Sequence, residues 1–213
     1  MTFGKVLILG DSYSTFEGFI PSGYDVYYKG DGSFGTGITK VEETWWHKLL
    51  SETDSELVLN DSWSGSTISY IGYDNVDCSK TSSFIYRLEK LCGEGFFAKN
   101  KIDTLLIFGG TNDSWLGTPL GEAKYENFAQ VDFYNVLPAI CYLVKKSCEV
   151  LPTAKVYFII NNELKPEIIA TIKDACEKFG ADTIQLSSVP KVKGHPDILG
   201  MEQIKNQILL SVE

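Results

Sequence analysis

Residues 5–14 read KVLILGDSYS, a short apolar run that ends at a glycine followed by acidic and hydroxyl side chains. The run Lys5–Leu9 has the length and the Val, Ile and Leu content of a strand that is covered on both faces. Similar runs recur downstream, and the stretches between them carry apolar residues at helical spacing. This alternation predicts βαβ units and a mostly parallel sheet. The expected strands are Lys5–Leu9, Glu56–Leu59, Thr104–Phe108, Lys155–Ile160 and Thr183–Leu186.

The helices are expected between these strands, over Glu43–Leu50, Ser83–Cys92, Asn127–Glu149, Glu163–Phe179 and Pro196–Leu210. Pro138 is expected to kink or interrupt the third helix, because proline lacks the N–H that a helix interior uses. Gly180 is a typical helix end. Two long connections, Phe16–Lys40 and Gly109–Glu126, show no helix or strand pattern. Loops of this length in a compact domain are usually functional or disordered.

Five parallel strands with helices on both sides predict an α/β fold with three α/β/α layers, for which the commonest strand order is 2-1-3-4-5. In that order the winding of the sheet reverses between the first and third strands, and ligands bind there beyond the carboxyl ends of the strands. The sequence contains no internal repeat or linker, so residues 1–213 are expected to form a single domain.

The composition excludes several classes of protein. Hydrophobic residues make up 44% of the 213 residues and charged residues 22%, which excludes intrinsic disorder. The net charge of −9 would repel a nucleic-acid backbone, and no basic cluster offsets it, so no nucleic-acid partner is expected. No apolar run approaches the ~20 residues of a membrane span, so no membrane partner is expected. The first strand follows Met1 almost directly with no signal peptide before it, which predicts a cytoplasmic protein; a leader already removed would leave no trace.

The cysteines and histidines argue against a disulfide framework and a metal centre. There are five cysteines, an odd number, and no Cys-x-x-Cys pair among them. His47 and His195 are the only histidines, too few for a zinc site. No metal and no cofactor is therefore expected. His47 lies in the expected first helix and is expected to pack or hydrogen-bond there.

Residues suited to acyl transfer follow four of the expected strands: Ser12, Gly65, Asn112 and His195. The carboxyl ends of parallel strands share one edge of a sheet, so these residues are expected to lie together. A serine hydroxyl becomes an effective nucleophile when a histidine takes its proton. The backbone N–H groups of Ser12 and Gly65 and the side-chain amide of Asn112 could then stabilise the anion that forms on the attacked carbonyl oxygen.

Four sequence blocks resemble those of the SGNH hydrolases, the family of GDSL-type lipases and esterases. The blocks are Gly10-Asp11-Ser12, Gly65 after Asn60, Gly110-Thr111-Asn112-Asp113, and His195-Pro196 followed by Gly200-Met201. Their order and spacing match the family from residue 10 to residue 201, and each block follows an expected strand. The resemblance implies a flavodoxin-like α/β/α fold and ester hydrolysis through an acyl-enzyme. It also implies Ser12 as the nucleophile, His195 as the base, and Ser12 N–H, Gly65 and Asn112 as the oxyanion hole.

The chain departs from the family at one position. The family places an aspartate three residues before the histidine, where this sequence has Val192. Such an aspartate holds the imidazole in one tautomer and stabilises the imidazolium. Three alternatives follow: a backbone carbonyl orients His195, a carboxylate such as Glu163 or Asp197 replaces the aspartate, or the enzyme is weak or inactive.

The same residues also have purely structural interpretations. Ser12 is a common turn residue and Asn112 a common loop cap, while Asp11 is expected to hold its turn through backbone hydrogen bonds. Asp113 is expected to anchor its loop. Ser14 occupies the position at which a Gly-x-Ser-x-Gly elbow would have glycine, so the α/β-hydrolase motif is not supported.

The substrate hypothesis rests on aromatic residues in or beside the loops at the active edge: Tyr13, Tyr24, Tyr27, Tyr28, Trp63 and Trp115. Flat rings with a polar edge suit the faces of sugars. We therefore expect a small-molecule or oligosaccharide ester as substrate, with acetyl as the favoured acyl group. The alternative is that the rings only pack the loops onto the domain. The loops offer few Leu or Ile residues for a long acyl chain.

Two further functions remain open at this stage. One is a catalytically weak or inactive relative that binds glycans, which the absence of the aspartate makes reasonable. The other is a flavodoxin-like protein that binds FMN, because Ser12–Thr15 resembles a hydroxyl-rich phosphate loop. That loop contains no glycine that would let the backbone wrap a phosphate.

Overall fold

The sheet extends to both sides of strand β1 (Lys5–Gly10), which pairs in parallel with β2 (Glu56–Ser62) and with β3 (Thr104–Phe108). Beyond β3 lie β4 (Lys155–Ile160) and β5 (Asp182–Gln185), again in parallel. The order β2-β1-β3-β4-β5 confirms the predicted fold class and the predicted strand order.

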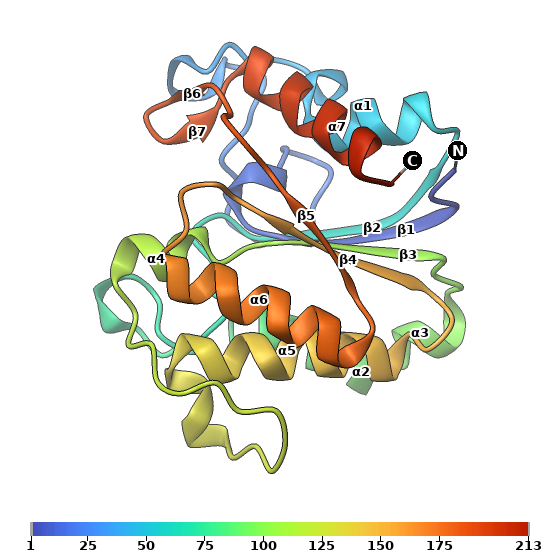
Figure 1. The fold of residues 1–213 in the computed structure, drawn as a ribbon. Coiled ribbons are helices and arrows are strands. Elements are labelled where there is room, and N and C mark those ends of the chain that lie inside the picture. The colour runs from blue at the N-terminus through green and yellow to red at the C-terminus, as the bar shows by residue number, and fades with distance from the viewer. Residues whose placement is uncertain (1, 213) are drawn as a thin grey trace.

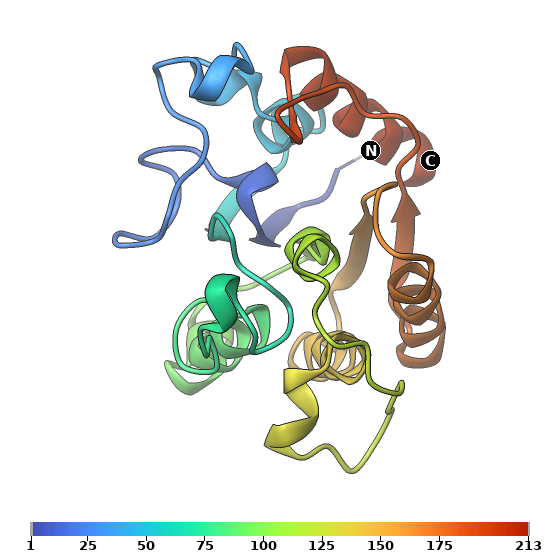
Figure 2. The same cartoon turned by 90° about the vertical axis from the view of Figure 1, so that its left-hand side faces the viewer.

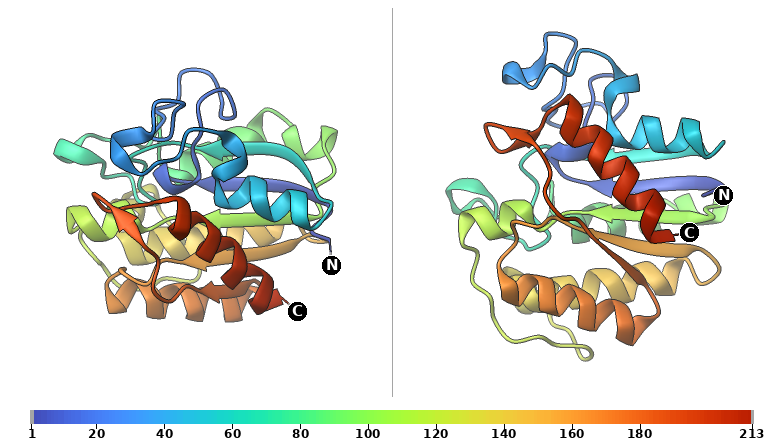
Figure 3. Two further views of the ribbon diagram at one scale, coloured as in Figure 1. Left: turned by 90° about the horizontal axis from the view of Figure 1, so that it is seen from above. Right: turned by 45° about the horizontal axis from the view of Figure 1, so that its top comes forward.

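Helices cover both faces of the sheet in this computed structural model, which describes residues 2–212. Helices α1 and α7 lie on one face, and α2, α5 and α6 lie on the other (Figures 1 and 3). The helices are α1 Trp45–Glu52, α2 Phe84–Gly93, α3 Phe96–Lys99, α4 Thr111–Leu116, α5 Val136–Val150, α6 Pro166–Phe179 and α7 Ile198–Val212. Two short strands, β6 (Lys191–Val192) and β7 (His195–Pro196), form a separate antiparallel hairpin.

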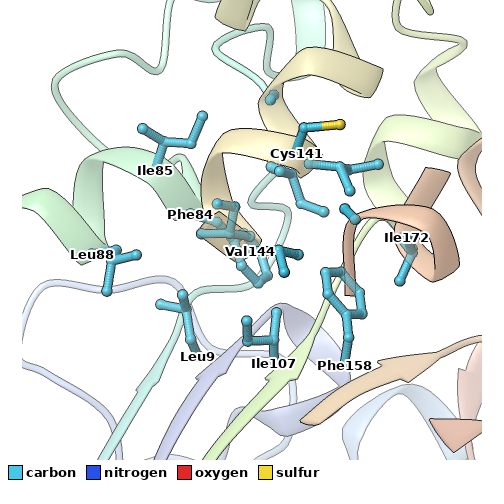
Figure 4. Packing of buried hydrophobic residues seen from close by; sticks show 14 of the residues in the cluster. Leu9, Phe84, Ile85, Leu88, Ile107, Cys141, Val144, Phe158 and Ile172 are labelled. Atoms are coloured by element: carbon cyan, nitrogen blue, oxygen red, sulfur yellow. The ribbon is translucent and has the colours of Figure 1, made fainter. Parts of the chain in front are cut away.

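The strands of the sheet bury alternate residues on its two faces. Leu9 and Phe158 belong to the core that also contains Val144 of α5 (Figure 4). Ile8 and Phe108 enter the second core, beneath α1 and α7. Burial on both faces explains why these strands read as continuous runs of Val, Ile and Leu rather than as alternating patterns.

The helix predicted over Asn127–Glu149 is wrong in its first part. A 3-10 turn occupies Gln130–Tyr134, and α5 begins only at Val136. Asn127 has φ of 53°, which breaks a helix. Pro138 therefore falls in the first turn of α5, where the backbone N–H has no partner within the helix, so it neither kinks nor interrupts the helix.

Most predicted helix ends lie within a few residues of the observed ends. Thr44 caps α1 and Ser83 caps α2, each through its side-chain oxygen. Pro166 opens α6, and Gly180 closes it at φ of 80°. The connection predicted as irregular over Gly109–Glu126 instead contains α4.

All five cysteines are free thiols. None of the helices within residues 2–212 has both the length and the apolar content needed to cross a membrane. No group of three His, Cys, Asp or Glu side chains in that range could hold a metal ion.

Arg87 of α2 is the only arginine in the sequence and is completely buried. Its Nη2 donates to Gly10 O at 3.1 Å, and its Nη1 donates to Asp61 O. A further Nη2 bond reaches Ser66 Oγ at 3.1 Å, and Nε donates to Ser82 O at 2.9 Å. One side chain thereby ties the ends of β1 and β2 to the loop that follows β2.

We expect Arg87→Met to lower the free energy of unfolding by about 3–5 kcal/mol. The change removes a buried charge from its partners and leaves several buried carbonyl groups without a hydrogen-bond donor. Urea denaturation at neutral pH measures the change. Lys90→Met is the matched control, since Lys90 is an exposed cation one turn further along α2. Equal stability of the two variants would contradict the structural importance of Arg87.

Candidate active site

The residues singled out in the sequence lie at the edge of the sheet formed by the carboxyl ends of its strands, which faces the viewer in Figure 2. Ser12 begins a 3-10 turn just after β1, and Gly65 lies in the loop after β2. Asn112 is in the first turn of α4, just after β3. His195 begins β7 in the hairpin that follows β5.

Ser12 and His195 are in direct contact. Ser12 Oγ lies 2.9 Å from His195 Nε2, although 183 positions separate the two residues. The other ring nitrogen, Nδ1, lies 3.2 Å from the carbonyl oxygen of Lys193. A carbonyl oxygen can only accept, so this contact places the proton on Nδ1 and leaves Nε2 able to accept the proton of Ser12.

The carboxylates considered as replacements for the missing aspartate have other partners. Glu163 pairs with Lys191 at 2.8 Å, and Asp197 accepts a hydrogen bond from the N–H of Gly200 at 2.8 Å. Val192 pairs with His195 across the β6–β7 hairpin. Of the three alternatives raised by the sequence, the backbone carbonyl is therefore the one whose geometry is present.

The β6–β7 hairpin is held from the side of Ser12. Its turn places Lys193 and Gly194 at φ of 50° and 80°, the left-handed region that favours glycine. Tyr13, the neighbour of Ser12, donates its hydroxyl to Gly194 O at 2.6 Å. Tyr28 donates its hydroxyl to Pro196 O at 2.8 Å. The turn that carries the serine and the hairpin that carries the histidine are thus fixed to each other.

The imidazole of His195 lies among aromatic rings. The ring of Tyr27 is parallel to it at 3.5 Å between centroids, and those of Tyr13 and Trp115 approach edge-on at 5.4 and 5.9 Å. Burial, together with the smaller effect of the Lys191 cation, lowers the pKa of His195 from 6.5 to about 4, and the hydrogen bond to the backbone of Lys193 opposes the shift.

Two of the expected oxyanion donors, Gly65 and Asn112, lie beside Tyr73. A Cβ on Gly65, which has φ of 78°, would lie 3.8 Å from the Tyr73 ring, and the Tyr73 hydroxyl donates to Asn112 Oδ1 at 2.9 Å. Asn112 Nδ2 donates one hydrogen to Ser66 O at 2.8 Å and has a second to offer. Among residues 2–212, the backbone N–H groups of Ser12 and Gly65 have no acceptor. Each of the three expected donor groups therefore has a hydrogen that is not used within the described residues.

The two aspartates beside these residues both have structural roles, of which that of Asp11 is the one that the sequence predicted. Asp11 accepts a hydrogen bond from the N–H of Tyr13 at 3.0 Å, which closes the turn after β1. Burial raises the pKa of Asp11 to about 7. Asp113 accepts from the N–H groups of Ile68 and Ser69, at 2.8 and 3.1 Å. It thereby anchors α4 to the loop after β2 rather than holding only its own loop.

The turn after β1 does not form a phosphate cradle. Ser14 and Thr15 have no exposed surface, and the Thr15 hydroxyl donates to Ser12 O and accepts from Tyr27 N–H. These hydroxyl groups are not available to an FMN phosphate, so the geometry gives no support to the flavodoxin alternative.

Sequence reasoning overlooked three residues of this edge: Tyr73, Asn161 and Lys191. Lys191 Nζ, on a side chain that is 8% exposed, lies 3.1 Å from Asn161 Oδ1 and 5.3 Å from the centroid of the Tyr13 ring. Asn161 directly follows β4, as the other site residues follow their strands, so its position could have identified it. Tyr73 lies well beyond the end of β2 and carries no such signal.

The fold and the site define an α/β/α protein with a serine–histidine pair at the edge where the winding of the sheet reverses. The family of GDSL-like lipases and acylhydrolases, an ester hydrolase family, matches residues 4–212. The chain belongs to this family.

Two crystal structures show the same relationship over nearly the full length of both proteins. A GDSL-like lipase from Bacteroides ovatus ATCC 8483 is 39% identical, with a TM-score of 0.90, and the match covers 99% of this chain and 98% of that chain. One from Bacteroides uniformis ATCC 8492 is also 39% identical, with a TM-score of 0.88 and coverage of 98% and 95%.

More distant structures share only the fold. The acetyl xylan esterase Est2A from Butyrivibrio proteoclasticus is 16% identical, with a TM-score of 0.60, and the match covers 100% of this chain and 64% of that one. No curated protein matches the chain.

We expect His195 to titrate with a midpoint near pH 4, below the ordinary 6.5, because burial and the Lys191 cation both disfavour the imidazolium. A lowered pKa keeps the ring neutral, and so able to accept a proton, down to that midpoint. NMR of the ring Cε1–H signal as a function of pH measures the pKa, with His195→Gln to assign the signal. A midpoint at or above 6.5 would contradict the buried environment.

Proposed function

We propose that the protein is a serine esterase that removes a short acyl group, acetyl in the favoured case, from a carbohydrate through an acyl-enzyme. Ser12 is the nucleophile and His195 the base, with Ser12 N–H, Gly65 N–H and the Asn112 amide as the oxyanion hole. The observation that carries the proposal is the 2.9 Å contact between Ser12 Oγ and His195 Nε2, with Nδ1 already bonded to a carbonyl.

The first half of the reaction acylates the serine. Ser12 Oγ bonds to the ester carbonyl carbon while its proton moves to Nε2 of His195. The carbonyl oxygen becomes an anion and accepts hydrogen bonds from the three donors; loss of one such donor typically costs ~10²–10³ in turnover. When the intermediate collapses, the bond to the sugar oxygen breaks and that oxygen takes the proton from His195.

The second half restores the enzyme. A water molecule gives its proton to His195 Nε2 as its oxygen bonds to the acyl carbon. Collapse of this second intermediate releases the carboxylic acid and returns the proton to Ser12 Oγ. The Lys193 carbonyl holds Nδ1–H throughout, so the same nitrogen, Nε2, moves the proton in both halves.

The carbohydrate part of the proposal rests on three of the six aromatic residues noted in the sequence. Tyr24 and Trp63 stack on each other at 4.1 Å between ring centroids, and Trp63 Nε1 donates to Asp25 Oδ2 at 3.0 Å. Trp115 is 43% exposed and its ring lies 5.9 Å from that of His195. Rings of this kind can pack against the apolar face of a sugar at the edge of the site.

The short acyl group is supported by the loops at the active edge, which offer few Leu or Ile residues for a long acyl chain. A pocket of about 340 Å³ has Phe19, Trp46, Leu50 and Leu57 among its walls. None of the residues that line it belongs to the Ser12–His195 pair or to the expected oxyanion hole.

We expect Ser12→Ala and His195→Ala each to abolish hydrolysis of a small activated acetate ester while the thermal midpoint and circular dichroism stay close to wild type. The reason is that each change removes one end of the proton transfer and leaves the cores untouched. Ser22→Ala, at an exposed serine of the long loop, is the matched control and should retain full activity. Activity of Ser12→Ala equal to that of wild type would end the assignment of the nucleophile.

We also expect acetylated xylo-oligosaccharides to be better substrates, by kcat/KM, than aryl esters of long-chain fatty acids. The choice of sugar follows the distant fold neighbour that is an acetyl xylan esterase. Trp63→Ala should raise KM several-fold for the sugar and leave the constants for a small aryl acetate unchanged, because only the sugar would use the ring. A preference for long acyl chains would overturn the carbohydrate hypothesis.

A further inference from the structure

The family pattern holds the catalytic imidazole with an aspartate, and this chain has Val192 in that position. The directional contacts left to His195 are those with Lys193 O on Nδ1 and with Ser12 Oγ on Nε2. Both contacts lie at the edge of the ring, one at each nitrogen. They act in the plane of the ring, and neither of them covers a face of the imidazole.

The ring of Tyr27 covers one of these faces. It lies over the face of the imidazole at 3.5 Å between centroids, and the two planes differ by 6°. We propose that Tyr27 is a positioning residue for His195, and that its ring takes over two tasks of the missing carboxylate: it fixes the plane of the imidazole and stabilises the imidazolium. This inference rests on the proposed function of the Ser12–His195 pair.

The backbone of Tyr27 is fixed to both halves of the site. Its N–H donates to Thr15 Oγ1 at 3.0 Å, and that hydroxyl donates to Ser12 O at 3.0 Å. The next residue, Tyr28, is completely buried and bonds to the carbonyl of Pro196. The position of the Tyr27 ring is thus set by the serine turn on one side and by the histidine hairpin on the other.

The charges around His195 make the face of the Tyr27 ring important when the imidazole is protonated. Lys191 is a buried cation that disfavours the imidazolium, and the carboxylate of Glu163 is engaged with Lys191. The face of an aromatic ring carries negative potential and attracts a cation placed over it. The stacked Tyr27 ring therefore supplies part of the stabilisation that an aspartate would otherwise supply.

The geometry disfavours a substrate-binding role for Tyr27. One face of its ring is covered by His195, and Tyr28 and Phe34 contact it at 5.0 Å between centroids. Its hydroxyl makes no hydrogen bond to any described residue in 2–212. The contact that matters is made by the ring alone, so phenylalanine should replace tyrosine without loss.

The first test compares Tyr27→Leu with Tyr27→Phe on a small aryl acetate. Tyr27→Leu is expected to lower kcat about tenfold with KM unchanged, the order of one cation–π contact, while Tyr27→Phe keeps the wild-type constants. Tyr125→Leu is the matched control. Tyr125 lies in another loop, where its ring packs on Phe179 and Lys178. Unchanged kcat in Tyr27→Leu, or a raised KM with unchanged kcat, would overturn the proposal.

A second variant covers the case in which Tyr27→Leu folds poorly. Phe34 is 65% exposed and contacts the Tyr27 ring, so Phe34→Ala loosens that ring without opening a core. It should lower kcat by a smaller factor than Tyr27→Leu, again with KM unchanged. A Phe34→Ala enzyme with wild-type kcat would count against a positioning role for the ring.

NMR tests the same inference without activity. The Nδ1–H proton of His195, bonded to Lys193 O, should give a downfield signal protected from exchange in wild type and Tyr27→Phe and lost in Tyr27→Leu. If wild type and Ser12→Ala hydrolyse esters equally, the proposed function fails, and this signal still decides whether Tyr27 holds the ring. A protected signal in Tyr27→Leu would overturn the positioning role.

Discussion

The geometry of the site depends on one buried cation. A guanidinium removed from water is costly unless its donors are used, and Arg87 uses four of its five N–H groups on Gly10 O, Asp61 O, Ser66 Oγ and Ser82 O. A shift of the β1 end or of the loop after β2 would leave one of those donors unpaired in the interior. The distance between the serine turn and the loop after β2 is therefore set by the fold itself.

A second constraint joins the two ends of the chain. Ser12 and His195 are far apart in sequence, and the hydrogen bond between them alone would be weak compensation for ordering both segments. Tyr13 and Tyr28 add hydroxyl bonds to the carbonyls of Gly194 and Pro196, on either side of the histidine. The hairpin is thus held through its backbone, which leaves the imidazole edge free for proton transfer. This explains how a base can be positioned without a carboxylate.

The sequence predicts what depends on periodicity and on strand ends. The apolar runs predicted the five strands. Because the carboxyl ends of parallel strands share one edge of the sheet, the sequence also predicted that Ser12 and His195 lie together. The sequence does not show contacts that depend on backbone direction. A helical apolar pattern continued across Asn127, although its positive φ ends the regular backbone there. The carbonyl of Lys193 reaches Nδ1 only because the two-residue turn of the hairpin points it there, and no residue type signals this. The stacking of Tyr27 likewise follows from the path of a long loop.

The aromatic residues around the site divide into two groups with different physical tasks. Tyr13 and Tyr28 are buried and use their hydroxyl groups within the protein, and the Tyr27 ring is covered by His195. The proposed function assigns Tyr24 and Trp63 to the substrate, together with the partly exposed Trp115. The loop Phe16–Lys40 carries both Tyr24 and Tyr27. A sugar bound at the Tyr24–Trp63 pair would therefore also stabilise the segment that holds the imidazole. Substrate binding and alignment of the base would then reinforce each other through a single loop.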